Sequence, residues 1–315
     1  MAPKLVPVGL YHFVQIPVSW TSARMGRRPP TPPTATIGRR RLRDAAVLLP
    51  QSRDGAVHAP QSRNSLLSSM SPTDFGLLQP DLEPVTLGLR QVLERPDRRV
   101  DAVYFPEAGF ASVVAVQADD TKVEVGLIGR EGMSGLTIVL GNHRSPHSTY
   151  MQAPGRGQRI GTVQFRKAMQ ASTSLQGFLL KYVQAFMVQT AHTAIANARA
   201  KLDQRLARWV LMAHDRLDGD SLPLTHEFLA LMLGVRRAGV TEAVHTLVTE
   251  KLIRSARSEI VVLNRKGLER RAGQSYGVPE AELRRLLGLQ RNVRDTKRVA
   301  ATAPRDAATH PRTVP

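Results

Sequence analysis

Hydrophobic and polar positions between residues 222 and 254 follow the period of two short helices joined by a tight turn. The segment reads LPLTHEFLALMLGVRRAGVTEAVHTLVTEKLIR. Leu229, Met232 and Leu233 would form the buried face of the first helix, which Thr225 can cap. Gly234 suits a left-handed turn because it lacks a Cβ. The second helix follows with apolar residues at i, i+4, i+7 and i+8, namely Val240, Val244, Leu247 and Val248.

This layout is that of a helix-turn-helix, whose second helix enters the major groove of DNA. A β-hairpin is predicted next, with one strand ending at Ile253, a turn at 256–259 and a return strand at 260–263. Such a hairpin would be the wing of a winged helix-turn-helix. An ordinary helical hairpin packed in a core fits the same helical pattern. The predicted wing and the arginine pair before the second helix favour DNA binding.

Residues 102–128 show a different pattern, which favours short strands. β-forming residues recur there, and turns are marked at 107–109 and 119–120. This spacing fits a small antiparallel barrel or jelly roll. The loop 129–135 then carries three glycines in seven residues. Glycines let a backbone approach a ligand or a neighbouring strand closely, so both interpretations stay open.

Residues 172–197 return to a helical period with a narrow apolar seam. Such a seam suits pairing with a second copy of the chain, and the alternative is that the helix packs on the barrel. A two-fold dimer would place two recognition helices at half-sites about one DNA turn apart. The predicted dimer contacts are Leu179, Val183, Phe186 and Thr190.

A further helix is predicted over 202–217. Its buried stripe would contain Leu206, Trp209, Val210 and Ala213. Arg205 and Arg208 are expected on its solvent side, where they would reach phosphates. His214 is expected to be structural.

Two parts of the sequence resemble Crp/Fnr-type bacterial transcription regulators. RLARWVLMAHDR and LTHEFLALMLGVRRAGVTEAVHTLVTEKLI are similar to their DNA-binding half, while VYFPEAGFASVVAV and VEVGLIGREGMSGL resemble their sensor domain. The resemblance spans about 64–276 and implies an α+β fold with three parts. These are an antiparallel jelly-roll-like β-barrel at 64–170, a long dimerisation helix at 171–200 and a C-terminal winged helix-turn-helix at 201–276. The basic flanks 1–63 and 289–315 have compositions that predict disorder.

The resemblance implies a homodimer that binds a palindromic operator and regulates transcription. Phosphate contacts are expected from Thr225, His226, Arg254 and Arg257. Contacts to base edges are expected from Arg236, Arg237, Thr241 and Glu242, and His245 lies on the same face. The family commonly has Arg-Glu near the start of this helix and another Arg one turn later. Here Ala238 and Glu242 occupy those Glu and Arg positions, so the preferred DNA should differ from that of the best-known members.

Cyclic-nucleotide-binding members of this family hold a Gly-Glu pair and, further on, an Arg-Ser pair for the phosphate. Here Leu136 stands where that Glu would be, and Pro146 follows the nearest Arg-Ser pair at an altered spacing. A cyclic nucleotide is therefore one alternative beside an unknown effector or none. The predicted effector pocket consists of Gly129, Arg130, Glu131, Gly132, Gly135, Arg144 and Ser145.

Charge supports a nucleic-acid partner only weakly, although the 315-residue chain has a formal net charge of +18. Residues 1–64 hold ten Lys and Arg against two acids, whereas 220–288 hold eleven against eight. This near balance keeps a second function open: an effector-binding sensor whose helical C-terminus contacts a protein partner rather than DNA. For the N-terminal segment, the alternatives are a basic arm on phosphates, a dispensable tail, or a coding start nearer Met25 or Met70.

Other classes of protein are disfavoured by what the sequence lacks. It has no cysteine, which excludes disulfides and the iron–sulfur branch of the family. No catalytic or metal-ligand motif is present, so we expect neither an enzyme nor a metal site. No apolar run reaches membrane-spanning length and no signal peptide is recognisable, which predicts a cytoplasmic protein. The expected partners are double-stranded DNA, a second copy and, for activation, RNA polymerase; activator and repressor are both open.

Overall fold

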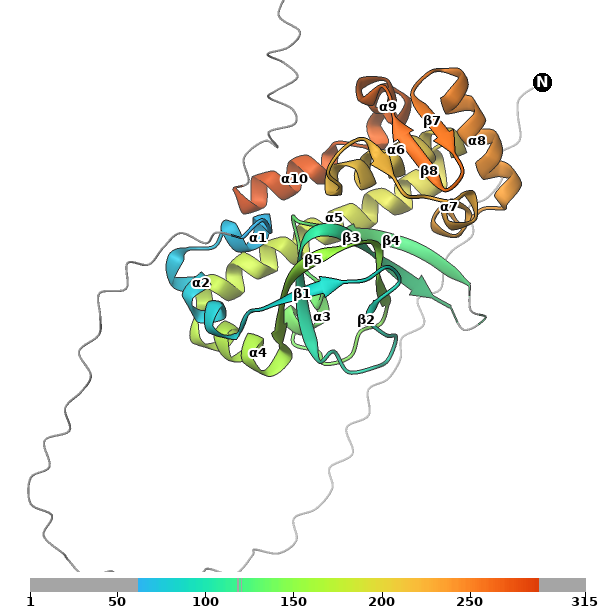
Figure 1. Cartoon of the computed structure of the whole chain (residues 1–315). Coiled ribbons are helices and arrows are strands. Elements are labelled where there is room, and N and C mark those ends of the chain that lie inside the picture. Colours follow the sequence, from blue (N-terminus) through green and yellow to red (C-terminus); the bar gives the residue numbers. More distant parts are fainter. Residues whose placement is uncertain (1–61, 118, 120, 289–315) are drawn as a thin grey trace, which may run out of the picture. The chain divides into compact units, whose positions relative to one another are not determined.

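The computed structural model describes residues 62–117, 119 and 121–288 (Figure 1). The disorder predicted for 1–63 and 289–315 falls outside these residues, apart from Ser62 and Arg63. The described part begins with two short helices, α1 (Ser65–Ser68) and α2 (Pro72–Leu78), and a 3-10 turn at Gln79–Asp81.

The first half of the fold is an antiparallel sheet of five strands. They are β1 (Glu83–Leu87), β2 (Val92–Glu94), β3 (Ala102–Val116), β4 (Lys122–Ile128) and β5 (Ser148–Gly161). Strand order is β1-β5-β3-β4, and β2 also pairs with β5. The register between the two long strands, β3 and β5, shifts around Pro106–Ala111. Such irregularities bend strands, and the sheet curls in Figure 1.

Helix α3 (Leu136–Val139) lies between β4 and β5, and α4 (Thr162–Ala171) and the long α5 (Thr173–Arg199) follow β5. Leu175, Leu179 and Val183 of α5 are buried in one core with Phe105 and Phe165. The predicted seam is therefore wrong for Leu179, which is fully buried within its own chain. Val183 and Phe186 are buried as well, and Thr190 is half-buried. The heptad-like spacing of these residues therefore reflects packing of α5 within its own domain, the alternative to dimer pairing given above.

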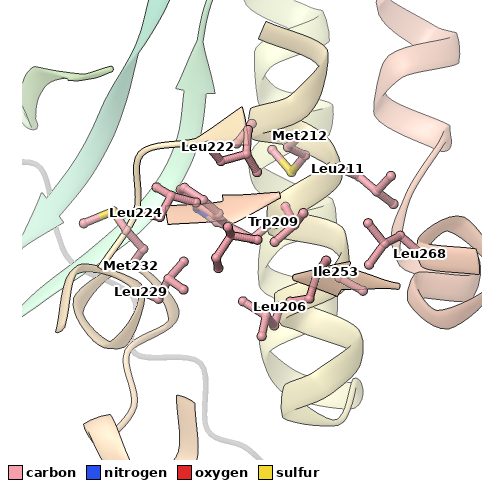
Figure 2. Close-up of a cluster of buried hydrophobic side chains, with 14 of the residues drawn as sticks. Leu206, Trp209, Leu211, Met212, Leu222, Leu224, Leu229, Met232, Ile253 and Leu268 are labelled. Atoms are coloured by element: carbon pink, nitrogen blue, oxygen red, sulfur yellow. The ribbon is translucent and has the colours of Figure 1, made fainter. Parts of the chain in front are cut away.

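The second half is a winged helix-turn-helix. Its elements are α6 (Leu202–Arg216), β6 (Ser221–Leu222), α7 (His226–Leu233), α8 (Arg237–Thr249), β7 (Ile253–Ala256), β8 (Glu259–Val262), α9 (Arg265–Ala272) and a 3-10 turn at Gly273–Ser275. Ile253 begins its strand rather than ending one, and Val248 is exposed rather than buried. Figure 2 shows the core that α6 shares with the wing and α7, centred on Trp209.

Helix α6 is buried on more sides than its predicted stripe requires. Arg208 is 5% exposed, and its guanidinium donates to Ser275 O and to Thr193 Oγ1. Arg205 is half-buried and donates to Leu233 O. The expectation of a solvent side with phosphate contacts is therefore wrong for both arginines. Their charges serve to join α6 to neighbouring segments.

A tenth helix, α10 (Val278–Leu287), follows the winged helix-turn-helix and was not predicted. Glu280 accepts from the backbone N–H of Gly277 and caps it, and Pro279 lies in its first turn. Leu287 is buried in the core that α5 and the sheet share. The chain thus returns from the winged helix-turn-helix to pack on α5. No helix in the described residues is long and apolar enough to cross a membrane.

Candidate nucleic-acid interface and effector cavity

The turn between α7 and α8 has the geometry that its residues predict. Thr225 Oγ1 accepts a 3.1 Å hydrogen bond from the backbone N–H of Phe228 and caps α7. Gly234 has φ 62°, the left-handed conformation expected of it. Arg236 remains extended, so α8 begins at Arg237. These local features set the crossing of the two helices.

Helix α8 has one buried and one exposed face. Val240, Ala243, Val244 and Leu247 are buried, as predicted for all but Ala243. The solvent face carries Arg236, Arg237, Thr241, Glu242 and His245. This polar face is the one that a helix in the major groove would present to base edges.

Thr225 and His226 have partners within the motif. The cap bond occupies Thr225 Oγ1, and His226 Nδ1 lies 3.2 Å from Thr241 Oγ1. Thr241 Oγ1 also donates to Arg237 O. The contact between His226 and Thr241 joins the start of α7 to α8. Thr225 and Arg236 also border an open cleft of about 1090 Å³ that reaches Lys122 and Tyr150 of the sheet.

The wing places two more cations beside α8. Strands β7 and β8 pair from Ile253–Val262 to Ala256–Glu259, and the turn between them contains Ser258 at φ 61°. Arg254 and Arg257 are exposed. Within the described chain, these two arginines form no ion pair, and neither do Arg236 and Arg237. Four guanidinium groups therefore remain available for an anionic partner.

A hydrogen-bonded cluster holds the base of the wing on α6. Arg265 Nη1 lies 2.9 Å from His214 Nδ1, and His214 Nε2 lies 2.8 Å from Asp220 Oδ1. Arginine can only donate, so Nδ1 accepts and Nε2 donates to the carboxylate. Arg265 also pairs with Asp215 at 2.7 Å. His214 is thus structural, as expected.

The predicted effector loop, 129–135, is a packing junction. Glu131 pairs with the buried Arg216 at 2.7 Å, and Arg130 pairs with Asp218 at 2.9 Å. A Cβ on Gly129 would lie 2.5 Å from Arg216 Cγ, and one on Gly132 would collide with the Tyr182 hydroxyl. The glycines therefore let α5 and the end of α6 approach. The effector-pocket prediction is wrong for Gly129, Arg130, Glu131 and Gly132.

The remaining predicted pocket residues are separated. Gly135 has φ 78°, and its N–H donates 2.8 Å to Glu94 Oε1. Arg144 is exposed and donates to Asp97 O. Of the seven predicted residues, Ser145 alone lines a cavity between the sheet and α5, which is described next. A pocket that gathers Arg144 with the glycine loop is therefore not formed.

That cavity, about 450 Å³, lies between the sheet and α5. Val113 and Ile128 come from the sheet, and Val183, Phe186 and Met187 come from α5. Thr149 of β5 and the segment 145–147 complete the wall with Glu94, Leu136, Thr137, Leu140, Thr190 and Ala191. Sequence reasoning missed this site because its residues come from separate segments and are ordinary core types.

Comparison with known proteins identifies the class of the C-terminal domain. The Crp-like helix-turn-helix domain model matches residues 204–271. The chain carries a Crp-like helix-turn-helix domain. The resemblance seen in the sequence is thereby confirmed for the DNA-binding half. No curated protein matches the sequence.

Solved structures extend the likeness to both halves of this Crp-like chain. A protein assigned to the crp/fnr family of transcriptional regulators, from Eubacterium rectale, is 15% identical with a TM-score of 0.54; the match covers 66% of this chain and 97% of that one. FixK2 from Bradyrhizobium japonicum is 14% identical with a TM-score of 0.52, covering 61% and 98%. The α+β fold class with a Crp/Fnr-type arrangement is therefore confirmed.

A cyclic nucleotide, which this fold family implies, does not fit the residues present. The cavity wall contains no arginine or lysine and does contain the carboxylate of Glu94. A phosphate buried there would lose its water without gaining a cation. Arg144, the nearest family-like candidate, is turned to Asp97 O instead.

Proposed function

We propose that this Crp-like chain is a cytoplasmic, sequence-specific DNA-binding regulator that binds a palindromic operator as a homodimer. The observation that carries the proposal is the exposed polar face of α8, flanked by a wing with two exposed arginines. Four guanidinium groups without an intrachain ion pair suit an anionic duplex. Thr241 and Glu242, exposed on the same helix, have polar side chains that can read base edges.

Roles within this surface follow from side-chain chemistry. Arg237, at the first position of α8, suits bidentate donation to guanine, and Glu242, one turn on, can accept from a cytosine amino group. Arg254 and Arg257 on the wing suit phosphates and would add affinity with little sequence preference. Thr225 caps α7 and His226 joins α7 to α8, so both would act by holding the motif together as well as by contacting phosphates.

A dimer seam is available on α5, on a different face from the one first predicted. Leu180 is 42% exposed, Met187 64% and Ile195 56%, and Ala191 is also exposed. Leu180, Met187 and Ala194 are spaced by sevens, with Gln184 and Ala191 between them and Ala198 one turn beyond Ala194; Ile195 adjoins this stripe. This is the pattern of a narrow coiled-coil seam, and all of these positions face solvent. We assign dimerisation to this stripe.

Selection from a random-duplex pool tests the function. The full chain is used at about 150 mM salt, which suppresses binding by phosphate attraction alone. An enriched palindrome with half-sites about one helical turn apart is expected. Arg237→Ala should abolish the enrichment at one base position of each half-site. A protein that selects no sequence, alone or with an effector library, would contradict the proposal and favour a C-terminal half that contacts a protein partner.

A further inference from the structure

The cavity between the sheet and α5 has the dimensions of a small-molecule site. Its volume of about 450 Å³ lies within the usual range for ligand pockets, roughly 300–1,000 Å³. Its wall is mainly aliphatic or aromatic, with Val113, Ile128 and Leu136 facing Val183 and Phe186 of α5. Ligand pockets are typically apolar with a few polar groups that fix orientation.

The polar groups of the wall are already engaged with the protein. Thr137 Oγ1 donates to Arg144 O at 3.0 Å, and Ser145 Oγ donates to His147 O at 3.0 Å. Thr190 Oγ1 donates to Phe186 O at 3.1 Å. Glu94 Oε1 accepts from Gly135 N. Because each of these hydroxyl groups already donates its hydrogen bond to a backbone carbonyl, it cannot donate one to a strongly hydrated ligand.

His147 is the exception in this wall. Its Nδ1 is buried and has no hydrogen-bond partner among the described residues. A buried polar atom without a partner costs free energy, and a partner supplied by a ligand would recover it. Because His147 lines the cavity, a ligand hydroxyl or carbonyl bound beside it would be a candidate partner for this nitrogen.

We propose that this cavity binds a small, uncharged and largely apolar molecule with one hydrogen-bonding group for His147. The proposal rests on the proposed function, because it names the effector class of that regulator. Burial of the carboxylate of Glu94 in a wall without lysine or arginine argues against phosphorylated and other anionic ligands.

The position of the cavity connects such a ligand to dimerisation. Met187 and Ala191 line it and also belong to the exposed stripe of α5. An apolar ligand would pack against both side chains from the sheet side. Occupancy would therefore change the shape of the seam through which the second copy is expected to pack.

A neutral fluorescent probe, N-phenyl-1-naphthylamine, tests the proposal on the full chain. Its fluorescence should rise and saturate on binding, and cyclic AMP should not displace it. Thr137→Trp places a large side chain at the cavity wall and should weaken probe binding about tenfold or more. Thr173→Trp, an exposed position of α5 that does not line the cavity, is the matched control and should leave binding unchanged. Circular dichroism checks that both variants fold.

Three outcomes would overturn the proposal. One is equal probe affinity in wild type and Thr137→Trp, which would place the probe elsewhere. Another is displacement of the probe by cyclic AMP. The third is probe binding only to a monomeric seam variant, which would show that the partner copy fills the cavity. Operator selection without ligand is scored separately, so a chain that selects DNA but fails these tests loses the effector class and keeps the proposed function.

Discussion

The indole Nε1–H of Trp209 on α6 donates a 2.6 Å hydrogen bond to Oε1 of Glu124 on β4. Ser112 Oγ donates to the other carboxylate oxygen at 2.6 Å. The Trp209 ring also meets Phe110 of β3 edge-on, with centroids 6.2 Å apart. The winged helix-turn-helix thus meets the sheet through a buried carboxylate as well as through apolar contacts.

Stability should fall as pH rises through the titration of Glu124. Burial raises the pKa of this carboxyl to about 7, against the opposing hydrogen bonds from Ser112 and Trp209. Below about pH 4.5 the group is protonated in both folded and unfolded states. Between about 4.5 and 7 the unfolded chain ionises first, so this group's contribution is lost progressively, on the order of 3 kcal/mol in all. Above about 7 the loss is complete.

Glu124→Gln should remove that part of the pH dependence, because an amide keeps the acceptor for Trp209 and does not ionise. Denaturant unfolding at pH 5 and pH 7.5 measures it. Glu83→Gln, on an exposed glutamate of β1, is the control and should leave the slope unchanged. If Glu124→Gln lost as much unfolding free energy between pH 5 and pH 7.5 as the wild type, another group would be responsible for the pH dependence.

Two glycine substitutions should have opposite effects. Gly132→Ala places a methyl group against the Tyr182 hydroxyl, which holds the backbone N–H and C=O of Met133 at 3.0 and 3.1 Å. We expect a loss of about 2 kcal/mol or more from this overpacking. Gly177→Ala lies in α5 with open space around it and should stabilise by about 0.5–1 kcal/mol. Thermal unfolding of the pair decides whether the loop is a packing junction.

Charges on the exposed stripe of α5 should produce monomers. Met187→Glu combined with Ile195→Glu leaves the buried face of the helix intact, so the fold should persist. Light scattering should then report half the wild-type mass, and operator affinity should fall sharply. Val163→Glu, on an equally exposed apolar residue of α4, should remain dimeric. A double variant that keeps the dimer mass would refute the seam.

Arginine substitutions should separate base reading from phosphate contact. Arg237→Ala should cost about 1–3 kcal/mol on the selected operator and relax preference at one base pair. Arg257→Ala on the wing should weaken all sequences alike and reduce the salt dependence by about one phosphate contact. Titration of matched and mismatched duplexes at several salt concentrations distinguishes the two. If Arg237→Ala instead weakened binding to matched and mismatched duplexes equally, Arg237 would be assigned a phosphate contact rather than a base contact.

The C-terminal helix should be integral to the fold. Leu287 is 5% exposed in the core shared with α5, so Leu287→Ala should destabilise by about 2–5 kcal/mol. Val278→Ala, on a half-exposed residue at the other end of α10, should change stability by less than about 1 kcal/mol. Similar values for the two would mean that α10 contributes little packing.

The features that could be predicted from the sequence alone are those that depend on local chemistry. Thr225 caps α7 and Gly234 turns left-handed because the preferences of these residues act over a few neighbouring residues. The polar face of α8 followed from the helical period, and the strands followed from recurring β-forming residues bounded by turn residues. Two details were wrong: Ile253 begins its strand rather than ending one, and Val248, in the last turn of α8, is exposed.

The packing partners of α5 and of the glycine-rich loop became known only from the folded structure. A heptad-like stripe predicts that a helix packs against something, but it does not distinguish the sheet of the same chain from a second copy. In the structure Leu179 is buried in the core of its own chain. The three glycines predicted a close neighbour of the loop. In the structure the neighbours of Gly129 and Gly132 are the side chains of Arg216 and Tyr182. The buried Glu124, the cavity beside Met187 and the return of α10 arise from contacts between distant segments. Such contacts depend on the packing of the whole chain, which no local pattern encodes.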